Sequence, residues 1–115
     1  MSLTEAGAVI VLGDSFFLQQ FRQIAALAAK YRLPSVSQFR EYVEAGGLMS
    51  YGTNLAERLR RAATYVDKIF KGTKPGDLPV EQATTFELLV NRKTAKALGL
   101  TIPQSVLLRA DREIE

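Results

Sequence analysis

The chain has 115 residues, of which 47% are hydrophobic and 23% charged, and this length and mixture are typical of one globular domain with its own core. It contains 0 Cys and 0 His, which excludes disulfides, thiolate nucleophiles, imidazole bases and zinc sites of the usual kind. The formal net charge of +3 is too small and too dispersed to favour nucleic acid as a partner.

The N-terminal region lacks the features of an export signal. Residues 1–8 contain no basic segment followed by a long apolar core, and the longest apolar run, Ala8 to Leu12, cannot cross a bilayer. Residues 1–3 are compatible with residues added by cloning in front of a fragment. We therefore expect no signal peptide in the chain as given.

The first half of the chain alternates between strand and helix patterns. Residues 8–12 form a continuous apolar, β-branched run, which is typical of a parallel strand covered on both faces. A helix is predicted over residues 16–31 from its three- and four-residue apolar spacing. A short strand over 34–37, a helix over 38–45 and a strand over 48–52 follow, with Gly46-Gly47 ending the second helix.

The second half continues the alternation. The clearest helix begins after Asn54, carries a stripe of apolar residues and ends before Gly72. The members of this stripe are Leu55, Leu59, Ala62, Val66 and Ile69. After a turn at Pro75-Gly76, Val80 and residues 86–90 predict one or two strands. Two helices are expected last, one from Asn91 to Gly99 and one from Pro103 to about Ala110.

This order predicts an α/β fold, a three-layer sandwich with a mostly parallel sheet of four to five strands flanked by helices. Ligands of such sheets bind beyond the carboxyl ends of the strands. Three segments are therefore candidates for function, residues 13–16, 37–39 and 50–54, because each joins a strand to the N-terminus of a helix.

The block Gly13-Asp14-Ser15 resembles the opening motif of GDSL-type lipases and esterases, in which the serine is the nucleophile. Those enzymes need a histidine to accept the serine proton, and this chain has none. Capping of the first helix by Asp14 or Ser15 is the favoured alternative. Similarly, the basic residues of the long helix, interrupted by Glu57 and Asp67, favour a solvated amphipathic helix over a nucleic-acid surface.

Most of the chain resembles one family. Its segments 39–52, 62–72, 77–82, 86–91, 94–100 and 102–103 are similar, in order, to the C-terminal lobe of ABC transporter substrate-binding proteins of the tryptophan- and tyrosine-binding branch. The resemblance implies a type I periplasmic-binding-protein fold, with two Rossmann-like α/β lobes, a hinge and a small molecule held between them. Residues 1–115 would then be a single lobe, a fragment without its N-terminal lobe.

The resemblance also implies a function. We expect no enzymatic activity and no cofactor or metal, an amino acid-like or aromatic ligand, an ABC permease as partner and a periplasmic location. The ligand-binding residues carried over are those at the strand ends: Asp14, Ser15, Phe16, Phe39, Ser50, Tyr51 and Gly52. Asp14 could accept a ligand ammonium, and Tyr51 or Phe16 could pack on an aromatic group.

An alternative function is an interaction domain that pairs with itself. The surface left by the missing lobe, especially residues 86–90 and the last two helices, is expected to associate two copies of the chain.

Overall fold

A computed structural model describes residues 5–115 of the chain, so the prediction for residues 1–3 lies outside the described residues. In chain order the elements are β1 (Val9–Val11), α1 (Ser15–Gln19), α2 (Phe21–Lys30), β2 (Ser35–Ser37), α3 (Arg40–Glu44), β3 (Met49–Gly52), α4 (Leu55–Phe70), the 3-10 turn η1 (Pro75–Asp77), β4 (Glu87–Asn91), α5 (Arg92–Ala97), α6 (Gln104–Leu107) and β5 (Arg112–Ile114).

The five strands form one sheet in the order β1-β2-β3-β4-β5. The pairs β1/β2, β2/β3 and β4/β5 are parallel, whereas β3 and β4 are antiparallel, with Gly52 opposite Glu87. The α/β fold with a mostly parallel sheet is therefore confirmed. The antiparallel strand is a departure from the predicted alternation, because α4 does not cross back over the sheet as a parallel connection requires.

The main core lies between one face of the sheet and helices α2 and α3. Its buried members are Val11, Phe21, Ala25, Phe39 and Tyr42. Tyr42 is fully buried, and its hydroxyl shares a hydrogen bond of 2.6 Å with the Ser35 hydroxyl on β2. The strands present small serines to α3 at this face, so the helix packs close to the sheet.

Four further details of the predicted elements differ from the structure. The helix predicted over 16–31 is divided at Gln20 into α1 and α2. Residues 8–12 are not covered on both faces, since Val11 is buried while Ile10 and Leu12 are 73% and 68% exposed. No strand forms at Val80, which is fully exposed, and the last helix ends at Leu107 so that β5 can pair with β4.

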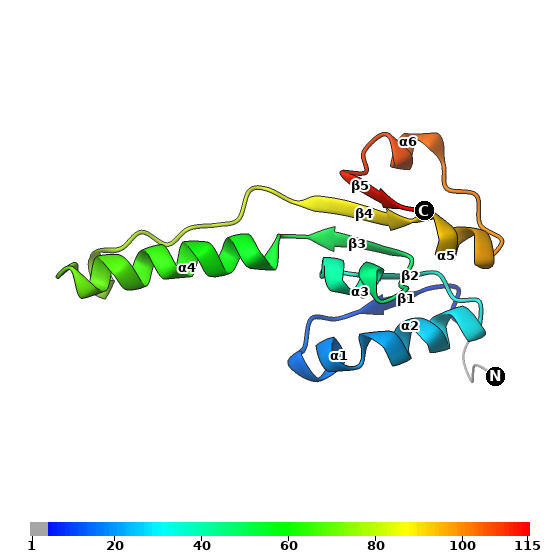
Figure 1. The fold of residues 1–115 in the computed structure, drawn as a ribbon, viewed down its shortest axis with the longest axis horizontal. Helices are drawn as coiled ribbons and strands as arrows, with labels where there is room; N and C mark the ends of the chain where they lie inside the picture. The colour runs from blue at the N-terminus through cyan, green and yellow to red at the C-terminus, as the bar shows by residue number, and fades with distance from the viewer. Residues whose placement is uncertain (1–4) are drawn as a thin grey trace.

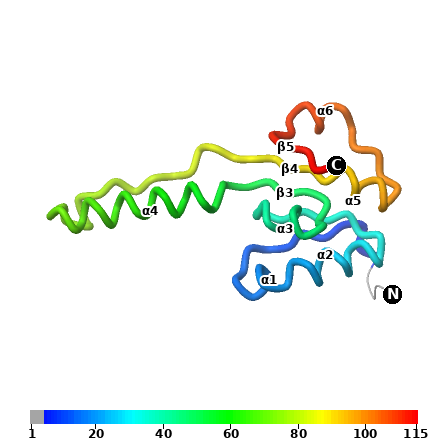
Figure 2. Tube along the Cα trace, viewed as in Figure 1, coloured from blue at the N-terminus to red at the C-terminus, as the bar shows by residue number. Residues whose placement is uncertain are grey.

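Residues 53–86 form an extension, here called the arm. Helix α4 leaves the sheet and points away from the body, and the chain then returns alongside it to β4 (Figures 1 and 2). The Tyr65 hydroxyl donates to the Pro79 carbonyl over 2.7 Å, and the Arg61 guanidinium pairs with Glu81. The arm explains a radius of gyration of 17.5 Å, compared with the ~13 Å expected for a compact chain of this length.

Candidate functional site

The carboxyl ends of β1, β2 and β3 meet at one edge of the sheet, because these three strands are parallel. Helices α1, α3 and α4 begin at this edge. Strand β4 is antiparallel to β3, so its first residues, and Phe86 before them, lie at the same edge. The three predicted candidate segments are therefore brought together, and the start of β4 joins them.

The loop after β1 caps α1. An Asp14 carboxylate oxygen accepts a hydrogen bond of 2.8 Å from the Phe16 backbone N–H, which makes Asp14 the N-cap residue. Ser15 begins the helix and is exposed, as is Phe16 at 65%. The predicted capping by Asp14 is confirmed, and a ligand ammonium at this carboxylate would share it with the cap.

Gln38 lies between the loops that follow β1 and β3. A Cβ atom added at Gly13 would overlap the Gln38 side-chain amide, and one added at Gly52 would overlap the Gln38 carbonyl oxygen. The overlap at position 52 is with backbone, so this residue must be glycine for the loops after β2 and β3 to approach this closely, whereas at position 13 a larger residue would require the Gln38 side chain to move. The sequence analysis identified the segment 37–39 but did not select Gln38, because only the sheet order places it between two glycines.

Two of the predicted site residues face the core. Phe39 is 7% exposed and its ring lies 6.3 Å from that of Phe21, while Ser50 is 1% exposed. The inward-facing positions of β3 and of the start of α3 carry both side chains into the core, and the predicted ligand-binding roles of Phe39 and Ser50 stay predictions. They support the edge from beneath.

Aromatic side chains gather on the exposed part of the edge. Tyr51 is 58% and Phe86 47% exposed, and their rings are stacked with centroids 5.6 Å apart and planes inclined by 21°. Phe86 was not among the predicted site residues, because its position beside Tyr51 follows from the antiparallel pairing of β3 with β4. The pair offers a flat, partly apolar surface to a ligand.

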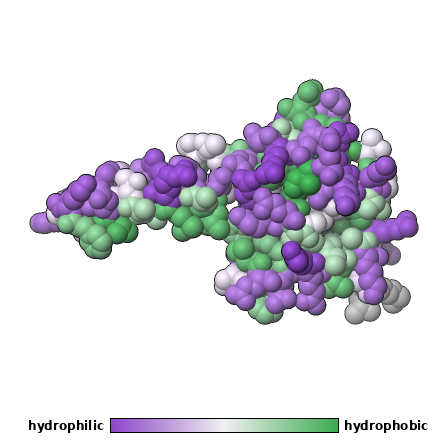
Figure 3. Space-filling view, viewed as in Figure 1, coloured by the Kyte–Doolittle hydropathy of each residue, from purple (hydrophilic) through white to green (hydrophobic). Residues whose placement is uncertain are grey.

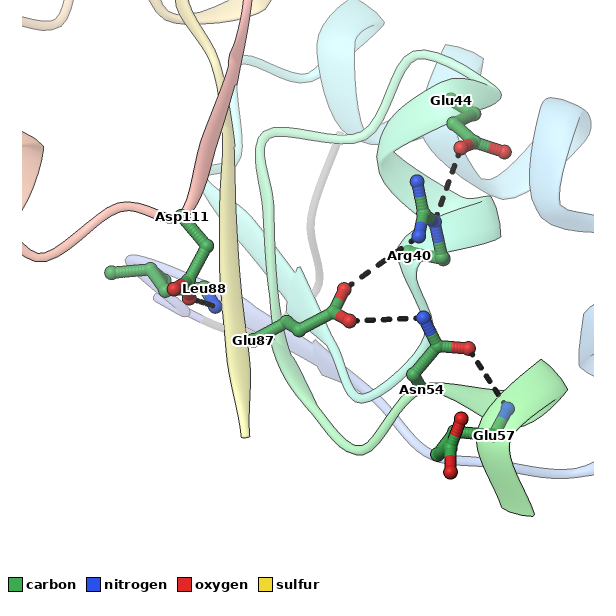
Figure 4. A network of polar contacts seen from close by, with 7 residues as sticks. All are labelled: Arg40, Glu44, Asn54, Glu57, Glu87, Leu88 and Asp111. Carbon is green, nitrogen blue, oxygen red and sulfur yellow. Dashed lines mark hydrogen bonds and ion pairs between the residues drawn. The ribbon is translucent and has the colours of Figure 1, made fainter. Parts of the chain in front are cut away.

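Glu87 joins the arm to the body. Its carboxylate accepts a hydrogen bond of 2.9 Å from the Asn54 side-chain amide and lies 3.6 Å from the Arg40 guanidinium, which also pairs with Glu44 (Figure 4). Asn54 in turn caps α4 by accepting from the Glu57 backbone N–H over 3.2 Å. We call Arg40, Asn54 and Glu87 the Glu87 clamp. It fixes the start of α4 to the start of α3 and β4.

A hollow lies beside the clamp, between α4 and the returning part of the arm. It is an open groove of about 700 Å³, and Arg58, Arg61, Tyr65 and Glu81 line it. The hydrogen bond and charge of Arg61 lower the pKa of the Glu81 carboxyl, and desolvation raises the pKa of the Tyr65 phenol. Thr53 and Asn54, from the predicted segment 50–54, line this groove, whereas none of the seven predicted ligand-binding residues does. The exposed stacked aromatic pair lies at the strand-end edge itself, so this edge is taken as the candidate site.

Metal-binding clusters and membrane-spanning helices were searched for in the described residues. Among residues 5–115, no group of three or more His, Cys, Asp or Glu side chains could hold a metal ion. Over the same range, no helix combines the length and apolarity needed to cross a membrane.

The five-stranded sheet and its flanking helices define the chain as an α/β lobe. It belongs to the ABC transporter substrate binding protein family, whose model matches residues 2–114. This is a family of binding proteins, not of enzymes.

Two solved structures are similar at 29% sequence identity. One is a conserved domain protein from Vibrio cholerae, with a TM-score of 0.89 over 95% of this chain and 37% of its own. The other is an ABC domain from Streptococcus pneumoniae in complex with L-Trp, with a TM-score of 0.86 over 96% of this chain and 38% of its own. The chain thus spans little more than a third of either structure.

A third similar structure shares the fold. It is a ligand-free, open substrate-binding protein with adhesive properties from Clostridium difficile, 22% identical, with a TM-score of 0.61 over 93% of this chain and 36% of its own. Among curated proteins, none matches the chain.

Proposed function

We propose that the chain supplies one side of the ligand site of an ABC transporter substrate-binding protein, and that an amino acid-like or aromatic molecule binds at the edge formed by the ends of β1, β2 and β3. The stacked Tyr51–Phe86 pair carries this proposal, because two exposed aromatic rings at a strand-end edge offer a surface suited to a planar ligand. The complex of the Streptococcus pneumoniae relative with L-Trp supports the choice of ligand class.

The remaining roles follow from the same edge. Tyr51 packs against an apolar or aromatic part of the ligand, and Phe16 contributes a second exposed ring. Asp14 receives the ligand ammonium, Ser15 and Gly52 lie within the loops that border the ligand, and Gln38 offers a side-chain amide beside Gly13. The whole protein would have two such lobes, deliver its ligand to an ABC permease and act in the periplasm.

We expect the ligand to bind this single lobe with a dissociation constant of about 1 mM. A site that is open on one side buries only part of the ligand, so about half of the contacts must offset the entropy lost when the ligand is immobilised. NMR titration of the chain with L-tryptophan and L-tyrosine tests the proposal. Chemical shifts should change in the loops after Val11, Ser37 and Ser50.

The matched variants are Tyr51→Ala and Tyr31→Ala. Tyr31 is similarly exposed, at 46%, but lies at the end of α2, away from the strand ends. Tyr51→Ala should weaken binding about fivefold through loss of one stacking surface, and Tyr31→Ala should leave it unchanged. Shifts centred on the arginines of α4, or no shifts at all, would contradict the proposal.

A further inference from the structure

The three residues of the Glu87 clamp are close in sequence to the residues that border the candidate site. The Glu87 carboxylate accepts a hydrogen bond of 2.9 Å from the Asn54 side-chain amide and lies 3.6 Å from the Arg40 guanidinium (Figure 4). Phe86 directly precedes Glu87 in the chain, and Tyr51 lies three residues before Asn54. The two stacked aromatic residues are therefore held by segments that the clamp joins.

The register of the sheet places the clamp and the aromatic pair on opposite faces. Gly52 lies directly opposite Glu87 on the neighbouring strand. Because successive side chains of a strand point to opposite faces, Glu87 points toward α3 and Arg40, whereas Phe86 points to the other face. Tyr51 precedes Gly52 and points to the same face as Phe86, and the two rings stack there as diagonal neighbours across the strands.

The backbone does not hold Phe86 in place. Glu87 is the first residue of β4, so Phe86 lies beyond the last pair of the ladder. Within residues 5–115 the backbone of Phe86 forms no hydrogen bond, and the segment 78–86 before β4 contains no helix or strand. A strand end of this kind opens at little cost in free energy. The position of Phe86 therefore depends on the side chain of Glu87 and on the stacking with Tyr51.

The clamp lies where the arm meets the body. The space-filling view shows the arm as a narrow projection from a broader body (Figure 3). Two chain segments cross this junction, one leaving after Gly52 and one returning before Glu87. The hydrogen bond from Asn54 to Glu87 joins these segments, and Arg40 ties them to α3. The side chains of Arg40 and Glu87 are each 29% exposed, so water and salt screen their attraction less than that of the exposed pairs on α4.

We propose that Glu87 is a positioning residue of the ligand site. Through its contacts with Asn54 and Arg40 it holds Phe86 against Tyr51, and this keeps the flat aromatic surface in place for the ligand. The inference rests on the proposed function, in that this surface is the one to which the ligand is proposed to bind. Glu87 acts through Phe86 and not on the ligand, because its side chain points to the face that carries α3.

The effect on binding follows from the order of the free site. A Phe86 ring that is free to leave Tyr51 must be ordered again when a ligand binds, and this loss of entropy lowers the affinity. Removing the clamp should therefore weaken binding about as much as removing the Phe86 ring, that is, about fivefold.

The first test needs no ligand. Nuclear Overhauser contacts between the ring protons of Tyr51 and Phe86 are measured by NMR in the natural chain and in Glu87→Ala. Since the ring centroids are 5.6 Å apart, such contacts should be present in the natural chain. We expect Glu87→Ala to reduce their intensity to about a fifth or less, because the end of the strand then opens.

Glu113→Ala is the matched control. Glu113 is also a strand residue that pairs with an arginine, at 3.2 Å from Arg92, and its side chain is 31% exposed compared with 29% for Glu87. It lies on β5, opposite Val90 near the other end of β4. The ring contacts should therefore keep their full intensity in Glu113→Ala.

The second test is titration with L-tryptophan. We expect Glu87→Ala and Phe86→Ala each to raise the dissociation constant about fivefold. If Glu87 acts through Phe86, adding Glu87→Ala to Phe86→Ala should change the dissociation constant by less than about twofold. Fully additive effects would show that Glu87 acts on binding by another route, and would overturn the proposal.

Amide hydrogen exchange of α3 and β4 verifies that each variant is folded. If Glu87→Ala does not fold, Asn54→Asp replaces it, because this variant faces Glu87 with a second carboxylate and should separate the rings in the same way. Ring contacts of natural intensity in a folded variant of either kind would overturn the proposal. The contacts are measured without ligand, so failure of the tryptophan titration and failure of the positioning role can be told apart.

Discussion

The hydrogen bond between Tyr42 and Ser35 is the polar contact most deeply placed in the core. Tyr42 is fully buried and Ser35 5% exposed, so Tyr42→Phe leaves the serine hydroxyl without its partner. We expect the free energy of unfolding to fall by about 1–2 kcal/mol. Urea denaturation measures this, and the double variant with Ser35→Ala should recover part of the loss because both polar groups are then removed. A double variant that loses the sum of both single effects would contradict this account.

The burial of the Tyr42 phenol also predicts that the free energy of unfolding depends on pH. Burial raises the pKa of the Tyr42 phenol, and the hydrogen bond with Ser35 opposes the shift only in part. The folded state therefore keeps its proton to higher pH than the unfolded state, so stability from this group is complete below about pH 10 and is lost as the pH rises further. The difference in unfolding free energy between the natural chain and Tyr42→Phe should shrink between pH 8 and pH 11. A constant difference would show that the phenol does not titrate with unfolding.

At the scale of elements, Asn54 has two separable tasks. Its side-chain oxygen caps α4 through the Glu57 N–H, and its amide donates to Glu87. Asn54→Asp keeps the cap but replaces the donor by a carboxylate facing Glu87, whereas Asn54→Ala removes both. We expect both variants to lose about 1 kcal/mol of stability, with faster amide exchange in the first turn of α4 only for Asn54→Ala. Thr64→Ala, on the exposed face of α4, is the control.

The elements also show what the sequence could predict. The stripe from Leu55 to Ile69 predicted α4 correctly, because helical spacing is a local property. What covers that stripe is a question of tertiary structure, and periodicity carries no information about it. The apolar run around Ile10 likewise predicted a strand, but its predicted cover on both faces was wrong, since only one face of β1 meets helices in the described residues.

The candidate site was predicted in the same partial way. The loops after β1, β2 and β3 could be located, since parallel strands bring their carboxyl ends to one edge. Phe86 could not, because the sequence suggested a parallel sheet and β4 is antiparallel to β3. Phe39 and Ser50 were selected by position alone, and the direction of their side chains toward the core depends on the register of the sheet. The ligand-binding roles of all the predicted site residues, Phe39 and Ser50 included, stay predictions.

At the scale of the whole molecule, the arm is an insertion into a β-hairpin. Gly52 at the end of β3 and Glu87 at the start of β4 are paired directly across the antiparallel ladder, although residues 53–86 separate them in sequence. The core cluster around Phe21 and Tyr42 contains no arm residue. The body should therefore fold without the arm.

Replacement of residues 53–86 by Asn-Gly tests this organisation. These two residues favour the tight turn that joins adjacent antiparallel strands, so the ladder from Met49 to Asn91 can close directly. The shorter connection reduces the entropy lost on closing the hairpin by on the order of 2 kcal/mol, which offsets the loss of the Asn54–Glu87 hydrogen bond. We expect a monomer with the natural amide protection in β3, α3 and β4, and a free energy of unfolding equal to or above that of the whole chain. Urea denaturation and hydrogen exchange measure both, and a collapsed state without protected amides would show that the arm is needed to fold the body.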